Sequence, residues 1–261
     1  MNEDDNGIAA SRGSVAVLYE DPKVVSEYLA RRMRYSWQRL LHQRQVKLLN
    51  EELARRAPET VLEVAPGPGR LTVEVRFAGR GIAIENSAEM LALSEMRLRS
   101  AGLIHAWDLR AGDAFDLQAV VPHNTIDFAF TFRLIRHFKI EDRRRLYSNL
   151  RDCIRPGGTL VFDVVNSERL IKIQAATPRR PAGELEVYDA SYTPEQIQKE
   201  LAESGFDLIT LLPLIKHFGI QSRIGHKLED ISSYVSNLLV EAIEAFPTRT
   251  PLEWVAVSQR R

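Results

Sequence analysis

The architecture of this chain follows from one short segment, Val61-Leu62-Glu63-Val64-Ala65-Pro66-Gly67-Pro68-Gly69-Arg70. Its first four residues are β-branched or apolar with one carboxylate, which predicts a buried strand. The strand leads into a turn of alternating prolines and glycines, in which Gly67 and Gly69 carry no Cβ and leave the backbone open to a ligand. A helix is expected to begin at residues 71–75. This order of strand, glycine-rich turn and helix is typical of the nucleotide-binding corner of a doubly wound sheet.

The same segment discriminates between two cofactors that contain adenosine. A dinucleotide pyrophosphate requires Gly-x-Gly-x-x-Gly, but the third glycine position, counted from Gly67, falls on Thr72. Glu63 at the end of the strand would repel a pyrophosphate, whereas it can accept hydrogen bonds from an ammonium group. The sequence therefore favours a cofactor with a cationic amino-acid end over NAD.

The segment resembles the first motif of class I S-adenosylmethionine-dependent methyltransferases, Asp/Glu-x-Gly-x-Gly-x-Gly. It reads here Glu63-x-Ala65-x-Gly67-x-Gly69, so that alanine replaces the first glycine and narrows the backbone approach at that position. The resemblance implies S-adenosylmethionine as the methyl donor and S-adenosylhomocysteine as the product. It also implies that Glu63, Ala65, Gly67 and Gly69 bind the cofactor.

A second strand is expected at residues 81–85, and it ends in Glu85, about 20 residues after the glycine-rich turn. A carboxylate there can accept hydrogen bonds from both ribose hydroxyls. The alternative is that Glu85 only caps a helix or lies on the surface, but its position at the carboxyl end of a strand favours ribose binding. Asn86, which begins the cap of a helix expected at 88–100, is assigned to the cofactor site, as is Met90, which would pack on the adenine.

A third strand is expected at residues 103–107, and the segment Ala111-Gly112-Asp113-Ala114 that follows it resembles the third motif of the same family. The resemblance implies that Asp113 accepts a hydrogen bond from the adenine amine and that the amide of Ala114 donates one to the ring. A Gly-Asp pair alone is usually a turn. Its place after the two earlier motifs favours the cofactor site.

A fourth strand, residues 125–131, ends in Thr131, which we assign to the cofactor site. The segment after it resembles the fourth motif of the family, which often carries a histidine and faces the transferable methyl group. Arg133 and Arg136 are therefore candidates for substrate binding, and His137 is a candidate general base. A structural histidine and a solvated Arg136 are the alternatives at these two positions.

The second half of the chain continues the alternation of helices and strands. The turn Arg155-Pro156-Gly157-Gly158 before an apolar strand resembles the fifth motif of the family, and Asn166 at the end of that strand is a candidate substrate ligand. An irregular, lid-like insertion is expected at about 167–193, and we assign its Tyr188 to the substrate. The remaining elements are expected to be helices at 141–153, 194–204 and 228–245, and strands at 159–165, 205–211 and 252–258.

These elements together predict an α/β fold with a Rossmann-like, doubly wound sheet of seven strands. The sheet would be mostly parallel, with one antiparallel strand near its C-terminal edge. Residues 1–14 are expected to be a disordered tail and 15–53 a helical lid, before a methyltransferase domain at 54–261. Tyr28 in the first helix of the lid is a substrate-binding candidate. The alternative is that the helices at 15–53 do not cover the site as a lid and only form a layer that packs on the rest of the domain.

Composition limits the partners and the compartment. The chain has 261 residues with 35 basic and 35 acidic side chains, so that no global field would attract nucleic acid or an anionic membrane. Its single cysteine, Cys153, fits a reducing compartment and a small buried hydrophobe, and no zinc pattern or other metal site is expected. The polar start and the absence of a long apolar run predict a cytoplasmic protein.

The sequence therefore predicts methyl transfer to an oxygen, nitrogen or carbon atom of a small-molecule acceptor. The chain lacks the Asn/Asp-Pro-Pro-Tyr/Phe and Pro-Cys motifs that would point to methylation of nucleic acid bases. A cofactor-binding regulatory or assembly protein without catalysis is the alternative. An NAD-dependent oxidoreductase is disfavoured by the missing third glycine. A monomer and a homodimer both remain open.

Overall fold

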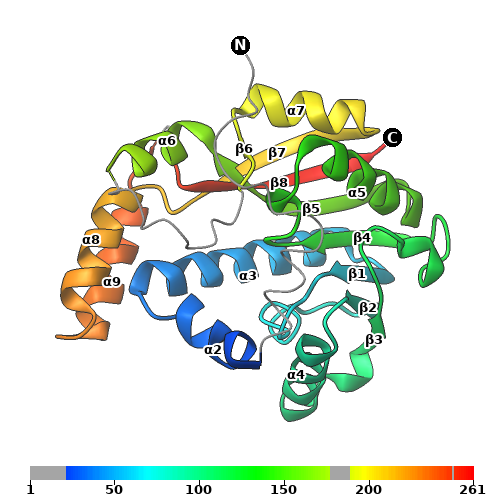
Figure 1. Cartoon of the computed structure of the whole chain (residues 1–261), viewed down its shortest axis with the longest axis horizontal. Coiled ribbons are helices and arrows are strands. Elements are labelled where there is room, and N and C mark those ends of the chain that lie inside the picture. The colour runs from blue at the N-terminus through cyan, green and yellow to red at the C-terminus, as the bar shows by residue number, and fades with distance from the viewer. Residues whose placement is uncertain (1–21, 177–188, 249) are drawn as a thin grey trace.

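The structure is a computed structural model that describes residues 22–176, 189–248 and 250–261 (Figure 1). Helices and strands alternate after two initial helices. The described elements are, in chain order, α2 (Pro22–Arg32), α3 (Ser36–Arg56), β1 (Thr60–Val64), β2 (Arg80–Glu85), α4 (Ala88–Ser100), η1 (Ile104–Ala106), β3 (Trp107–Ala111), η2 (Leu117–Ala119), β4 (Ile126–Thr131), η3 (Ile135–His137), α5 (Ile140–Cys153), β5 (Ile154–Asn166), α6 (Ser167–Ala176), β6 (Ser191–Tyr192), α7 (Pro194–Glu203), β7 (Phe206–Leu214), α8 (Phe218–Leu228), α9 (Ser233–Glu244) and β8 (Glu253–Arg260).

One sheet organises the chain, in the order β3-β2-β1-β4-β5-β8-β7. Strand β8 runs antiparallel to both of its neighbours, β5 and β7, whereas the pairs from β3 to β5 are parallel. The expected doubly wound sheet with one antiparallel strand near its edge is confirmed, and the two-residue β6 pairs with the end of β5 as an eighth strand. The strand order reverses between β1 and β4, which is where such sheets bind ligands.

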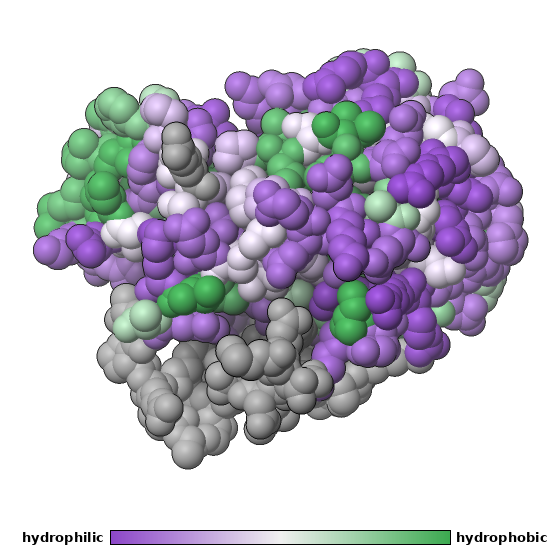
Figure 2. All heavy atoms as spheres, turned by 90° about the horizontal axis from the view of Figure 1, so that it is seen from above, coloured by the Kyte–Doolittle hydropathy of each residue, from purple (hydrophilic) through white to green (hydrophobic). Residues whose placement is uncertain are grey.

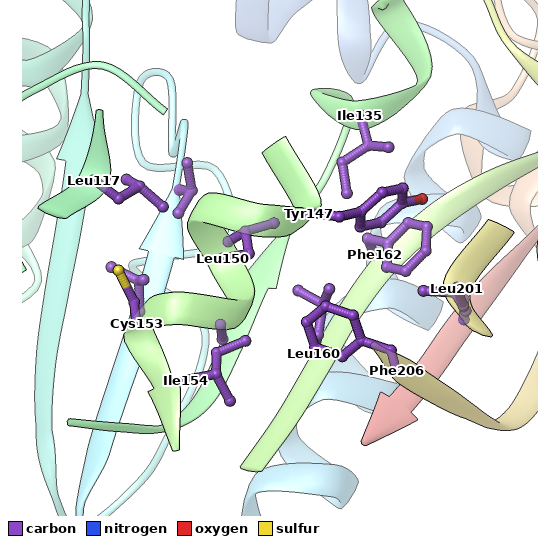
Figure 3. Packing of buried hydrophobic residues seen from close by; sticks show 14 of the residues in the cluster. Leu117, Ile135, Tyr147, Leu150, Cys153, Ile154, Leu160, Phe162, Leu201 and Phe206 are labelled. Carbon is purple, nitrogen blue, oxygen red and sulfur yellow. The ribbon is translucent and has the colours of Figure 1, made fainter. Parts of the chain in front are cut away.

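Helices cover both faces of the sheet (Figure 1). On one face, α5 and α7 pack on β5 and β7, with Tyr147 and Leu150 beside Phe162 and Phe206 (Figure 3). On the other face, α3 packs leucines such as Leu49 and Leu53 against β1 and β4. Cys153 is fully buried in the first of these clusters, and burial raises the pKa of its thiol to about 12. The expectation of a small buried hydrophobe at Cys153 is confirmed.

The prediction that a helix begins at residues 71–75 is wrong. Residues 67–74 form consecutive turns, with isolated hydrogen bonds such as that from the Val75 amide to the Leu71 carbonyl at 3.0 Å. Thr72, Val73 and Val75 are β-branched, and such side chains lose rotamer freedom in a helix.

The prediction of a strand at residues 103–107 is wrong as well. Residues 104–106 form the 3-10 turn η1, and the strand begins only at Trp107, whose register partner in β2 is Gly81. A Cβ on Gly81 would lie 2.5 Å from Cε3 of Trp107, so that the indole packs where a side chain is missing. The turn brings Trp107 to that position after Gly102 ends α4 with a φ of 71°.

Two further expectations need correction near the C-terminal half. The helix expected at 228–245 is α9, which begins only at Ser233 because Ser232 caps it by accepting a hydrogen bond from the Val235 amide at 3.3 Å. The helix α8 that precedes it was not predicted. The insertion expected to be irregular begins with the helix α6. Residues 177–188 of the insertion lie outside the described residues, as does the tail 1–14, and the end of the insertion contains the short strand β6.

An apolar region of the surface lies on and around α8 and α9. Figure 2 shows it at one end of the molecule. Among the described helices, none is long and apolar enough to cross a membrane. The exposed apolar side chains of this region are Ile220, Ile231, Tyr234, Val235, Leu238, Leu239 and Phe246.

Candidate functional site

A cavity of about 210 Å³ lies at the carboxyl ends of β1, β2, β3 and β4. The topology places it there because parallel strands of one sheet end at the same edge. Ten residues that the sequence assigned to the site line this cavity, namely Tyr28, Glu63, Ala65, Gly67, Glu85, Asn86, Met90, Asp113, Ala114 and Arg133. The other assigned residues within the described ranges, Gly69, Thr131, Arg136, His137 and Asn166, are not among its lining, and Tyr188 lies outside the described residues.

The glycine-rich turn forms one wall of the cavity. Gly67 has a φ of 58°, and a Cβ on it would meet no atom within 4 Å, so that its open side faces the cavity. Gly69 serves a different purpose, because a Cβ there would lie 2.7 Å from Oγ of Ser94 in α4. Ala65 also has a left-handed φ of 57°, at the position where the motif has glycine. The backbone therefore adopts the conformation that glycine favours, although alanine occupies the position.

Glu85 connects this turn to the end of β2. Its Oε2 accepts a hydrogen bond from the Gly67 amide at 2.8 Å, and its Oε1 accepts from the amides of Asn86 and Ser87 at 2.9 and 3.0 Å. Burial raises the pKa of Glu85, while the three backbone donors act in the opposite direction. The carboxylate is thereby held at the cavity wall in one orientation, with lone pairs left for further donors.

Glu63 is a buried acid that lacks a full set of partners. Its side chain is 3% exposed, and its Oε2 has no hydrogen-bond partner among the described residues. Burial raises the pKa of Glu63 to about 8. A buried carboxylate oxygen without a donor is costly to a protein, so that a donor from a ligand would satisfy it.

Arg70 is a site residue that the sequence argument missed, although it directly follows the glycine-rich turn. It lines the cavity and is 8% exposed. Its Nη1 lies 2.7 Å from Nδ1 of His42 and donates to Oε1 of Gln45 at 2.9 Å. Burial and Arg70 lower the pKa of His42, which fits a neutral ring that accepts from the guanidinium. None of the ion pairs in the described part of the chain involves Arg70.

Glu63 and Arg70 together suit the amino-acid end of a methionine-derived cofactor. The orphaned carboxylate oxygen of Glu63 matches an α-ammonium group, and the guanidinium of Arg70 matches an α-carboxylate. At the other end of the cavity, Glu85, Asp113 and Met90 present two carboxylates and an apolar side chain to an adenosine. The residues that line the cavity therefore fit such a group.

Arg133 lines the cavity from the end of β4. Its backbone has a left-handed φ of 63°, and its amide donates to Oδ1 of Asp163 at 2.6 Å. The buried Nε of its guanidinium has no hydrogen-bond partner among the described residues. Strained backbone at a cleft is a frequent mark of functional residues. The neighbouring lining residues Phe132, Leu134 and Phe138 are apolar.

Arg136 and His137 belong to a buried network behind this wall. Arg136 forms ion pairs with Asp163 at 3.1 Å, Asp189 at 2.7 Å and Glu253 at 3.3 Å. Burial alone disfavours its charge, but these carboxylates raise the pKa of Arg136 above its usual value. Nδ1 of His137 lies 3.1 Å from Oδ1 of Asp189, and the ring is 4% exposed.

Thr131 and Asn166 hold strand ends together. Oγ1 of Thr131 donates to the Val64 carbonyl at 2.7 Å and so connects β4 to β1. Nδ2 of Asn166 donates to the Pro251 carbonyl at 3.0 Å. Both side chains are buried, and both brace the sheet edge on which the cavity rests.

The two N-terminal helices have different relations to the site. α2 borders the cavity through Tyr28. α3 lies in the core, and its His42 accepts from Arg70 at Nδ1 while its Nε2 lies 2.7 Å from Oε1 of Glu74. α3 therefore positions the glycine-rich turn from behind.

Comparisons with known proteins agree with this arrangement. Residues 61–158 match the family model described as a methyltransferase domain. A malonyl-[acyl-carrier protein] O-methyltransferase of Xylella fastidiosa (strain M23) is 29% identical over 145 residues, which are 52% of this chain and 46% of that protein. The match thus spans about half the length of that relative.

Solved structures share the fold over most of their length. Magnesium protoporphyrin IX methyltransferase from Synechocystis PCC 6803, crystallised with bound S-adenosylhomocysteine, is 14% identical with a TM-score of 0.58 and covers 87% of this chain and 86% of its own. The [4+2]-cyclase SpnF is 17% identical with a TM-score of 0.66, over 98% of this chain and 99% of its own.

Proposed function

We propose that this chain is a class I methyltransferase that transfers the methyl group of S-adenosylmethionine to a small-molecule acceptor. The observation that carries the proposal is the pairing of Glu63 and Arg70 on the cavity wall. Each is a buried ionisable group without an oppositely charged hydrogen-bond partner among the described residues. A zwitterionic methionine end would supply one partner to each.

The adenosine end has its own set of residues. Glu85 would accept from the ribose hydroxyls, because three backbone amides already orient its carboxylate toward the cavity. Asp113 and the amide of Ala114 would read the adenine edge, and Met90 would pack on its face. Gly67 would allow the close approach that a side chain there would block.

The chain's own contribution to the reaction is alignment and the exclusion of water. S-adenosylmethionine carries an activated methyl group on a sulfonium, so that little further activation is required. Holding donor and acceptor in line can contribute about 7 kcal/mol or more to the lowering of the barrier. Phe132, Leu134 and Phe138 would exclude water from the acceptor side.

A general base has little support within the cavity. The described lining contains neither histidine nor lysine nor cysteine, and the ring of His137 is directed to Asp189. We therefore favour a positioning role for His137, in which it orients Asp189 and with it the ion pair to Arg136. An acceptor that enters already deprotonated would make a base unnecessary.

The proteins with similar sequence or fold keep more than one chemistry open. The relative from Xylella fastidiosa is named for O-methylation of a malonyl acyl-carrier protein, and the protein from Synechocystis for a magnesium porphyrin. A cofactor-binding protein that does not methylate is the second candidate, since the cyclase shares this fold and is named for a different reaction.

Two measurements test the proposed function. Calorimetric titration with S-adenosylhomocysteine and, separately, with NAD establishes the cofactor, and we expect binding of the former alone. Incubation with methyl-tritiated S-adenosylmethionine and a pool of small metabolites should then transfer label to a product. Binding without any transfer would favour the second candidate, and binding of NAD alone would contradict both.

A further inference from the structure

We propose that the acceptor is a carboxylate on an apolar body, and that Arg133 binds this carboxylate while it is methylated to an ester. The inference rests on the proposed function and names its substrate class. It comes from the position and the incomplete pairing of one guanidinium, and from the character of the side chains around it.

The guanidinium of Arg133 forms no ion pair with any of the described residues, although the charges of Asp163 and Glu253 lie near enough to act on it. Among the described residues, Arg133 takes part in a hydrogen bond through its backbone amide, which donates to Asp163 at 2.6 Å. Its Nε is buried and unpartnered. Burial, and then the nearby Arg136, lower the pKa of Arg133, so that the protein leaves this cation in an unfavourable setting. A bound anion would reverse that cost.

The surroundings of Arg133 are rich in positive charge. A second, smaller hollow is bordered by Arg32, Arg70 and Arg133, and its described lining contains no acidic residue. Arg70 and Arg133 border the main cavity as well. The three carboxylates of that cavity, Glu63, Glu85 and Asp113, belong instead to the corner where the cofactor would lie.

The other buried arginines near the site are already engaged. Arg136 is paired with three carboxylates, Asp163, Asp189 and Glu253. Arg70 lies next to Glu63 in the glycine-rich turn and would hold the carboxylate of the cofactor. Arg133 therefore remains available to bind the acceptor. It has a left-handed φ of 63° and directly follows β4, which is paired with β1, the strand that leads into the glycine-rich turn.

A carboxylate acceptor also fits a described lining that contains no histidine, lysine or cysteine, because no proton has to be removed from it. Carboxylic acids have a pKa of about 4 and are ionised at neutral pH. A carboxylate oxygen forms a bond to the methyl carbon, the carbon–sulfur bond breaks, and its electron pair stays on sulfur. The products are a methyl ester and neutral-sulfur S-adenosylhomocysteine, and no proton is released. Phe132, Leu134 and Phe138 beside Arg133 would contact the apolar body.

The first experiment identifies the bond that is made. Label from methyl-tritiated S-adenosylmethionine is transferred to a pool of small metabolites, and the product is then treated with alkali. Methyl esters release volatile tritiated methanol, whereas ethers and N-methyl or C-methyl products keep the label. Volatile label is the expected result. Transfer to products that survive alkali would overturn the inference while leaving the proposed function intact, and no transfer at all would contradict the proposed function itself.

The second experiment tests Arg133 by binding. Octanoate and its neutral counterpart octanamide are titrated into protein saturated with S-adenosylhomocysteine, and octyl phosphate is included to separate carboxylates from phosphates. We expect octanoate to bind roughly tenfold or more tightly than octanamide, and Arg133→Gln to abolish the difference. Arg133→Lys should retain part of it, and Arg144→Gln, at an exposed arginine paired with Glu203, should change nothing.

Two controls keep this result interpretable. Affinity for S-adenosylhomocysteine should be equal in the wild type and in Arg133→Gln, which shows that the variant is folded and that Arg133 does not hold the cofactor. A loss of that affinity in a variant that melts like the wild type would assign Arg133 to the cofactor and overturn the inference. An octanoate preference that persists in Arg133→Gln, or stronger binding of octyl phosphate alone, would overturn it too.

Discussion

The backbone amide of Gly67 donates a hydrogen bond to Oε2 of Glu85 at 2.8 Å, and this contact joins the loop after β1 to the last residue of β2. Two positions that are 18 residues apart in the sequence thus form one wall of the cavity. The carboxylate of Glu85 is oriented before any ligand arrives, and such preorganisation reduces the cost of binding.

Glu85→Ala should weaken S-adenosylhomocysteine binding by roughly 1 to 3 kcal/mol, because ribose hydroxyls would lose a charged acceptor. The glycine-rich turn should loosen as well, since the Gly67 amide loses its acceptor. Isothermal titration gives the affinity and thermal melting gives the stability. Glu95→Ala, at an exposed acid of α4, is the matched control and should leave the affinity unchanged. An unaltered dissociation constant in Glu85→Ala would remove this residue from the cofactor site.

The raised pKa of Glu63 predicts that cofactor binding depends on pH. Burial moves this pKa from an ordinary 4.5 to about 8, so that the folded protein without ligand holds a proton on Glu63 at neutral pH. An ammonium group favours the ionised form, so that binding should release a proton. Affinity for S-adenosylhomocysteine should therefore rise as pH increases from 6 to 8, and Glu63→Gln should remove that dependence. Titrations in two buffers of different ionisation enthalpy measure the proton released.

The same shift has a consequence for stability, with a definite sign. A carboxyl whose pKa is higher in the folded than in the unfolded state contributes stability that is present below the unfolded value of 4.5 and is lost as pH rises through about 8. Glu63→Gln should therefore flatten the decline in the free energy of unfolding between these values. Urea unfolding across this range measures it. An equal decline in the variant would assign the effect to other groups.

Ala65→Gly should leave the free energy of unfolding unchanged or raise it slightly. A left-handed φ of 57° costs a non-glycine residue about 1 kcal/mol, and Ala65→Gly removes this strain. The resulting gain in stability is offset because glycine has a larger conformational entropy in the unfolded chain. Ala101→Gly is the control, because Ala101 has an ordinary φ of −84° and should lose about 0.5 to 1 kcal/mol. Denaturant unfolding compares the two. Equal losses would show that position 65 is not strained.

Glu200→Ala should destabilise the fold by about 3 to 5 kcal/mol, because it leaves a buried guanidinium without its partner. Arg143 donates to both oxygens of Glu200 at 2.9 Å and so fastens α5 to α7. Neither residue lines the cavity, so that the folded variant should bind S-adenosylhomocysteine as the wild type does. Glu203→Ala, in an exposed pair with Arg144, should cost less than about 1 kcal/mol. Similar losses in the two variants would contradict the proposed importance of burial.

Local chemistry made several parts of the fold predictable. Ser87 caps α4 and Thr193 caps α7 with the hydrogen bonds that such residues make at helix starts, and both helices begin where the sequence indicated. The strands β1, β2 and β4 were evident because apolar residues run without interruption into turn signals. The order of motifs along the chain then indicated the sheet.

Long-range packing explains where the prediction failed. The apolar residues around 104–106 resemble a strand, but Gly81 and Trp107 set the register of β3 from outside that segment. The turns at 67–74 stand where a helix was expected, and within them Gly69 packs closely on Ser94 of α4. Neither constraint is visible within a local window.

The amino-acid order was enough to establish the strand–turn corner, the sheet class and the acids Glu63, Glu85 and Asp113, because each depends on residue type and spacing along the chain. Only the folded chain shows that Arg70 meets His42 and Gln45, that Arg136 is neutralised by Asp163, Asp189 and Glu253, and that Arg133 is left unpaired. The physical reason is that a charge is paired or unpaired according to what other strands and helices bring within a few ångströms of it. The spacing of residues within one segment of sequence does not show which residues of other segments become those neighbours.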